Sequence, residues 1–157
     1  MQCQGTRANN SQYTTTGAAN FSGPAYADFS PSAVVIIAGT IGHSTIIDSL
    51  IASGKIDVSQ TKGKWESFTS QLVENPVNGT AKALVIAGSD PRGSIYGIYD
   101  VSEQIGVSPW YFWTDTPPKQ SKNHYVISSK KVQGPPSVKY RGFFLNDEQP
   151  ALTNWVA

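Results

Sequence analysis

Residues 33–54, AVVIIAGTIGHSTIIDSLIASG, have the pattern of a strand, a glycine turn and a helix. The unbroken apolar run over residues 33–38 is typical of a strand buried on both faces in the middle of an α/β sheet. Isoleucine and leucine then recur at helical spacing. With Ser44 as the N-cap and Gly54 just past the end, this spacing predicts a helix over about 44–53.

A second buried strand is predicted at residues 83–88, ALVIAG. Asn78-Gly79, shortly before it, is a strong signal for a tight turn between antiparallel strands. The preceding stretch, residues 65–74, fits either a helix or a strand by its own pattern. We expect a hairpin across the Asn-Gly turn, and therefore a mixed sheet.

A second amphipathic helix is predicted after residues 90–93, DPRG, and Gly106 ends it. Its periodic positions are Ile95, Ile98, Tyr99, Ser102 and Ile105. Further along, the sequence predicts a short strand near residues 125–127. Gly-Pro-Pro at 134–136 predicts a domain boundary, because proline cannot continue a sheet ladder.

The composition excludes several classes of protein. Of the 157 residues 39% are hydrophobic and 15% charged, and the net charge is +1, which gives no electrostatic case for nucleic-acid binding. No apolar run approaches the ~20 residues that span a bilayer, so we expect no membrane association. Cys3 is the one cysteine and cannot form an internal disulfide or a zinc site. We expect no metal and no cofactor.

The amino-terminal segment and the polar composition point to the outside of a cell. Residues 1–30 are rich in Gly, Ser, Thr and Asn, and we interpret them as a poorly ordered arm. Three Asn-x-Ser/Thr triplets begin at Asn9, Asn20 and Asn78 and are acceptors for glycosylation. We therefore expect an extracellular, secreted protein whose signal sequence is not in this chain.

Three motifs have a structural and a functional interpretation. The turn over residues 39–44 could cradle phosphate, but it matches no nucleotide fingerprint, so we favour a tight strand-to-helix turn. His43 is accordingly interpreted as a residue of this turn. Asp90 and Arg92 could bind an anion, but a helix cap with a structural arginine is favoured. The aromatic residues 110–113 could stack on a sugar, but interdomain packing is favoured.

The best chemical candidate is Asn146-Asp147-Glu148, at the end of a strand predicted over residues 140–146. Neighbouring strand residues point to opposite faces, so the two carboxylates can serve one substrate only if the strand has already ended. A strand ending in carboxylates usually continues into a helix and more strands, so we expect the chain to be truncated.

Taken in order, six segments resemble the N-terminal region of glycoside hydrolase family 115, the xylan α-1,2-glucuronidases. They are IIAGTIG at 36–42, GKWE at 63–66, VIAGSD at 85–90, RGSIYGIYD at 92–100, GVSPWY at 106–111 and KYRG at 139–142. The resemblance covers about residues 31–157.

The resemblance implies an accessory α/β domain over residues 31–134, a mixed sheet with helices. A catalytic (β/α)₈ barrel follows, of which residues 135–157 carry only the truncated first strand. Asp147 is then the expected catalytic carboxylate, with Asn146 and Glu148 as substrate-binding support at the mouth of the barrel.

By the same resemblance, the enzyme removes glucuronic acid or its 4-O-methyl ether from glucuronoxylan or its oligosaccharides. It inverts the anomeric carbon with two carboxylates. A homodimer of the full-length enzyme is a further expectation. The fragment alone is expected to be inactive, since the other acidic residues lie on later strands. Two alternatives are a non-catalytic carbohydrate-binding module and a nucleotide-binding domain.

Overall fold

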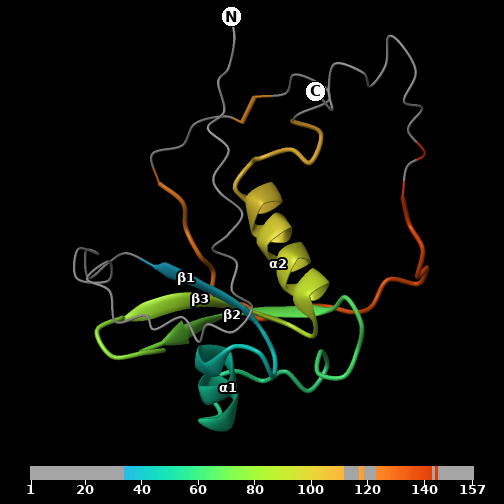
Figure 1. Cartoon of the computed structure of the whole chain (residues 1–157). Helices are drawn as coiled ribbons and strands as arrows, with labels where there is room; N and C mark the ends of the chain where they lie inside the picture. The colour runs from blue at the N-terminus through green and yellow to red at the C-terminus, as the bar shows by residue number, and fades with distance from the viewer. Residues whose placement is uncertain (1–33, 112–116, 119–122, 143, 145–157) are drawn as a thin grey trace, which may run out of the picture.

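Four strands and two helices make up the described part of the chain. The structure is a computed structural model that describes residues 34–111, 117–118, 123–142 and 144. The elements, in chain order, are β1 (Val35–Thr40), α1 (Thr45–Ala52), β2 (Phe68–Glu74), β3 (Lys82–Gly88), α2 (Pro91–Gln104) and β4 (Lys131–Gln133) (Figure 1).

The strands form one mixed sheet in the order β1-β3-β2-β4. β1 is parallel to β3, whereas β2 is antiparallel to both of its neighbours. The two helices cover opposite faces of this sheet (Figure 1). The predicted α/β class and mixed sheet are therefore confirmed.

The larger hydrophobic core lies between the sheet and α1. Alternate residues of β3 point to this face because side chains alternate along a strand. They meet the inner side of α1 and the loop that follows it. The buried members are Ile37, Ile47, Leu50, Ile56, Val58, Val73, Ala83, Val85 and Ala87.

On the other face, α2 lies against the sheet through glycines. Gly93 and Gly97 are its buried residues. A Cβ at Gly97 would clash with Ile86 and lie 3.2 Å from the ring of Phe68, and one at Gly93 would clash with the carbonyl of Ser67. This close approach turns the predicted apolar residues of the helix away from the sheet.

The predicted helix ends are confirmed. The Ser44 side chain caps α1, and the Asp90 Oδ1 atom accepts a hydrogen bond of 2.7 Å from the backbone N–H of Gly93 at the start of α2. Gly54 and Gly106 follow the two helices with φ of +71° and +95°, a conformation that glycine adopts at no steric cost.

The hairpin prediction is also confirmed. β2 pairs with β3 from Phe68↔Gly88 to Glu74↔Lys82, so the ambiguous stretch is a strand from Phe68 onward. Gly79 in the connecting turn has φ of +83°. Asn75, at the start of the turn, also has a positive φ, of 48°.

Two strand predictions are wrong in part. β1 exists but is not buried on both faces, since it pairs only with β3 among the described residues and Ile36 is 55% exposed. The short strand is not at residues 125–127 but at β4. There Lys131 pairs with Asp100 of α2, and the adjacent Lys130 pairs with Asp57, which fixes this stretch beside β2.

Several predictions fall outside the described residues. They concern the arm over residues 1–30 with Cys3, Asn9 and Asn20, the aromatics at 112–113, and the cluster at 146–148. Residues 140–142, the described start of the predicted barrel strand, are not in a strand. The first barrel strand and the division at residue 134 stay predictions.

None of the helices in the described ranges is long and apolar enough to cross a membrane.

The glycine contact of α2 gives a test of the fold. Gly97→Ala should lower the free energy of unfolding by about 1–3 kcal/mol, because the added methyl overpacks the contact with Ile86 and Phe68. Urea unfolding measures this change. Gly134→Ala is the matched control, since a Cβ there meets no atom within 4 Å and should not destabilise the domain. Equal stability of the two variants would show that the close approach is not needed.

Candidate functional site

The start of β2 and the start of α2 are joined by one carboxylate. Glu66 precedes β2 with a backbone φ of 48°, and its N–H donates a hydrogen bond of 2.6 Å to Asp90 Oδ2. The other oxygen of Asp90 caps α2. Beside this contact, Ser67 and Ser89 exchange hydrogen bonds of 2.8 and 3.0 Å. These contacts fix Glu66 in a backbone conformation that is uncommon for a residue other than glycine.

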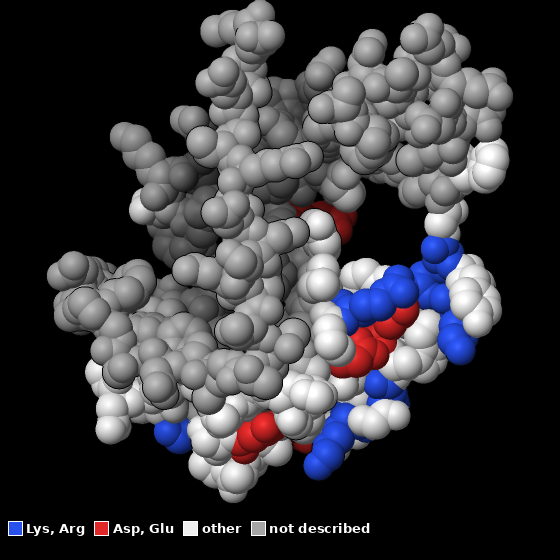
Figure 2. Space-filling model, in the orientation of Figure 1, with Lys and Arg blue, Asp and Glu red and all other residues white. Residues whose placement is uncertain are grey.

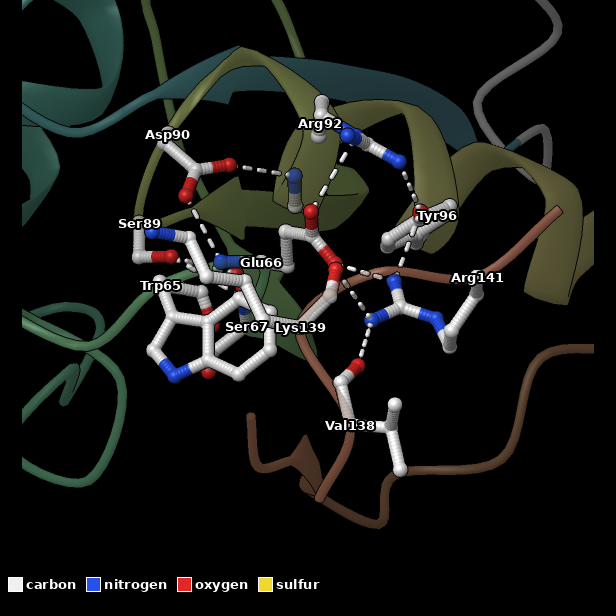
Figure 3. A network of polar contacts seen from close by, with 11 residues as sticks. Trp65, Glu66, Ser67, Ser89, Asp90, Arg92, Tyr96, Val138, Lys139 and Arg141 are labelled. Atoms are coloured by element: carbon white, nitrogen blue, oxygen red, sulfur yellow. Dashed lines mark hydrogen bonds and ion pairs between the residues drawn. The ribbon is translucent and has the colours of Figure 1, made fainter. Parts of the chain in front are cut away.

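The Glu66 carboxylate is buried between two arginines (Figure 3). Its side chain is 8% exposed; Oε1 lies 3.2 Å from Arg92 Nε, and Oε2 accepts a hydrogen bond from Arg141 Nη2. Arg92 comes from the first turn of α2, whereas Arg141 is 75 residues away from Glu66 in sequence. A buried charge is costly unless it is paired and hydrogen-bonded, and here it is both.

Two aromatic residues complete the arrangement. The Tyr96 hydroxyl oxygen accepts hydrogen bonds of 3.0 Å from Arg92 and 3.1 Å from Arg141. The guanidinium of Arg141 lies 5.8 Å from the centroid of the Trp65 ring, within the range of a cation–π contact. Arg141 also donates to the backbone carbonyl of Val138, which folds the segment over 138–141 onto itself.

We call Glu66, Asp90, Arg92, Tyr96 and Arg141 the Glu66 cluster. Its two carboxylates and two guanidiniums balance in charge. The hydrogen bond from Arg92 to Tyr96, and then the nearby Glu66 carboxylate, raise the pKa of Arg92. The hydrogen bond to Glu66 raises the pKa of Arg141.

Both oxygens of Glu66 have a cationic partner, so this carboxylate is not set up for acid–base catalysis. The cluster instead ties residues 138–141 to the N-terminal half of α2. Figure 2 shows the same balance of charge on one face, where acidic and basic atoms lie next to one another.

The favoured interpretations of the turn and cap motifs are confirmed. Residues 39–44 form a tight turn in which Gly42 has φ of +79° and donates a hydrogen bond of 2.8 Å to Asp48. His43 is exposed in this turn. Asp90 is the cap of α2, and Arg92 is the ion-pair partner of Glu66.

A groove of about 460 Å³ lies beside α2. Trp110 and Tyr111, the described half of the aromatic cluster, are 53% and 52% exposed, and Tyr111 lines the groove. The other lining residues are Phe68, Tyr96, Tyr99, Asp100, Ser102, Glu103, Val107, Ser108 and Pro109.

The predicted catalytic residue Asp147 and its neighbours Asn146 and Glu148 lie outside the described residues. Their roles stay predictions. Within the described ranges, no three His, Cys, Asp or Glu side chains gather in a group that could hold a metal ion.

Sequence reasoning did not single out Glu66, Tyr96 or Arg141 as site residues. Each lies in one of the segments on which the family resemblance depends: GKWE, RGSIYGIYD and KYRG. The structure brings these three segments into one cluster, although they are far apart in the sequence.

A family profile and a solved structure both match this chain. The profile of Glycosyl hydrolase family 115 matches residues 133–157. A solved structure of a family GH115 4-O-methyl-α-glucuronidase, with specificity for decorated arabinogalactans, is 40% identical with a TM-score of 0.62. The match covers 76% of this chain and 14% of that chain. No curated protein matches.

The Glu66 cluster gives a second test. Glu66→Gln removes the charge that both arginines share, so the free energy of unfolding should fall by about 1–3 kcal/mol. Hydrogen exchange at residues 138–142 should become faster, because Arg141 loses its anchor. Thermal unfolding and peptide-resolved exchange measure the two effects.

Glu74→Gln is the control for this test. It removes an exposed ion pair with Lys82 and should change stability by less than about 0.5 kcal/mol. Unchanged exchange at residues 138–142 in Glu66→Gln would contradict the anchoring role.

Proposed function

Because this chain belongs to glycoside hydrolase family 115, we propose that it is the N-terminal accessory domain of an enzyme that removes glucuronic acid, or its 4-O-methyl ether, from xylan. The observation that carries the proposal is the 40% identity over 76% of this chain, which corresponds to 14% of the related glucuronidase. The chain thus spans a small part of that relative, and the activity is proposed for the longer enzyme.

The proposed chemistry needs two carboxylates. An inverting glycosidase protonates the leaving oxygen with one and activates water with the other, their carboxyl groups being roughly 6.5–9.5 Å apart. We propose Asp147 as one active-site carboxylate, with Asn146 and Glu148 in contact with substrate. The family match over residues 133–157 includes all three, which supports this assignment.

The described residues have a supporting part in this proposal. The Glu66 cluster holds residues 138–141 against the domain, five residues before Asn146. It thereby fixes where the polypeptide leaves the accessory domain on its way to the proposed active site. The cluster itself takes no part in bond cleavage, because its carboxylates are occupied by arginine and backbone N–H groups.

The proposal also specifies the polysaccharide from which the glucuronic acid is removed. The related enzyme has specificity for decorated arabinogalactans. Xylan is the substrate implied by the family resemblance of this sequence. Release of glucuronic acid from glucuronoxylan and from decorated arabinogalactan, compared in one assay with the longer enzyme, distinguishes the two.

An extracellular location is part of the same proposal. Asn78 of the third glycosylation triplet is exposed in the turn between β2 and β3, where a glycan would be accommodated. Mass spectrometry of the secreted protein would show a glycan on this residue.

The purified 157-residue chain should release no glucuronic acid from glucuronoxylan or its oligosaccharides. The physical reason is that an inverting reaction needs a second placed carboxylate. Chromatography of the released uronic acid measures this, with the related glucuronidase and its own substrate as the positive control. Release above the level without enzyme would contradict the accessory role.

A carbohydrate-binding module is the second candidate, favoured by exposed Tyr111, which lines the groove, and by its exposed sequence neighbour Trp110. Trp110 and Tyr111 are each about half exposed, and aromatic faces suit the apolar faces of sugar rings. This candidate predicts that xylo-oligosaccharides quench tryptophan fluorescence and that Tyr111→Ala, at the exposed aromatic that lines the groove, abolishes binding. Tyr125→Ala, at an exposed aromatic that does not line the groove, is the control. If no binding is detected, the carbohydrate-binding candidate is rejected and the accessory role is the remaining one.

A further inference from the structure

The outer face of α2 carries an apolar stripe that the described part of the domain leaves about half exposed or more. Ile95, Ile98 and Tyr99 are 48%, 47% and 67% exposed, and Ile105 continues the stripe one residue past the helix. We call these four residues the α2 outer stripe. The spacing of its members in the helix is that of an amphipathic helix facing a core.

The other helix provides an internal comparison. The outward positions of α1 are Thr45, Ser49 and Ala52, which are exposed and either polar or small. Of its large apolar residues, Ile47 and Leu50 are buried under the sheet, and Ile46 and Ile51 are partly buried against the same core. Of the two helices, α2 therefore has an exposed apolar stripe and α1 does not.

The stripe is turned outward by the packing of α2 and cannot turn inward at this distance. Gly93 and Gly97 contact the sheet so closely that even a methyl group at either position would clash. Isoleucine and tyrosine could face the sheet only if the helix moved away from it. The same contact that holds the helix therefore leaves its apolar side available to another surface.

A groove adjoins the stripe. Tyr99 belongs to both, and from there the groove of about 460 Å³ runs past Val107 and Pro109 to Tyr111. Contiguous apolar patches on a soluble domain mark interaction sites when they exceed scattered single residues. The stripe and the groove together form such a patch, with a hollow that fits inserted side chains.

We propose that the α2 outer stripe and the adjoining groove are the interface with the catalytic part of the family 115 polypeptide that follows this domain. Two observations name this occupant. The chain corresponds to 14% of the related enzyme, so most of such a polypeptide lies outside it. The Glu66 cluster also ties residues 138–141 to Arg92 and Tyr96 of α2, so the chain leaves the domain beside the stripe.

This inference rests on the proposed function, since it takes the occupant from the family. Beyond the proposed function, it specifies which face of the domain contacts the catalytic part. The outward positions of α1 are polar or small, and Arg141 bonds to Glu66 and to Tyr96 of α2, so the α1 side is the expected free face.

Cysteine labelling tests the interface. In a Cys3→Ser background, Ile98→Cys reports on the stripe and Ser49→Cys on the opposite helix. In the 157-residue chain both thiols should react with a maleimide at similar rates. The second protein is a chimera in which this chain replaces the matching 14% of the related glucuronidase. In it the thiol at residue 98 should react at least about tenfold more slowly, because labelling then requires local opening of the interface. The thiol at residue 49 should keep its rate.

Peptide-resolved mass spectrometry separates these thiols from those of the partner polypeptide. Activity of the chimera on the substrate of the related enzyme shows that it is folded. This control does not depend on which polysaccharide the natural protein cleaves, so failure of the inference and failure of the proposed function are distinguishable. If the chimera is inactive, the related enzyme lacking the matching segment is added to the labelled chain instead, and protection at residue 98 is again the supporting result.

Rapid labelling at both positions in the active chimera overturns the proposal. So does a labelling rate at residue 98 that stays unchanged when the shortened enzyme is added. Three further results would assign the stripe to another occupant and overturn it as well. Slow labelling that depends on the concentration of the 157-residue chain indicates a second copy. Slow labelling that is relieved by deleting residues 1–33 indicates the chain's own N-terminal segment. Slow labelling only with xylo-oligosaccharide indicates a sugar surface.

Discussion

The close contact of α2 with the sheet at Gly93 and Gly97 is the constraint on which the rest of the structure depends. It places the first turns of α2 directly beside the start of β2, where Asp90 holds the backbone of Glu66. It also decides the rotation of the helix, so that the arginine and tyrosine of its N-terminal half face the buried carboxylate. The apolar residues on the remaining side then face outward.

This arrangement fits the proposed role of the domain as an accessory part of a longer enzyme. Its polar cluster is closed, with each carboxylate oxygen matched by a cation or an N–H group. Such a cluster is not reactive but holds a defined geometry, because the planar guanidiniums of Arg92 and Arg141 each contact both Glu66 and Tyr96. The domain fixes a polypeptide segment, and in the proposed function the bond-breaking chemistry belongs to residues outside this cluster.

The sequence analysis predicts the elements with strong local signals and misses those that depend on distant contacts. β1, α1, β3 and α2 follow from apolar runs, caps and glycine turns, and the hairpin follows from Asn78-Gly79. β4 has no such signal, because its position depends on pairing with β2. The Glu66 cluster joins residues 75 positions apart through a backbone with positive φ, which no local pattern encodes. The family segments contained its members without revealing that they meet.

The central claim is that Glu66 and Arg141 act on each other across the domain and so fix the segment that leaves it. A double-mutant cycle with Glu66→Gln and Arg141→Gln measures this most directly, using urea unfolding followed by tryptophan fluorescence. The account predicts a coupling free energy of about 1–2 kcal/mol, since the two side chains are in contact and share a partly buried network. Additive effects of the two substitutions would contradict it.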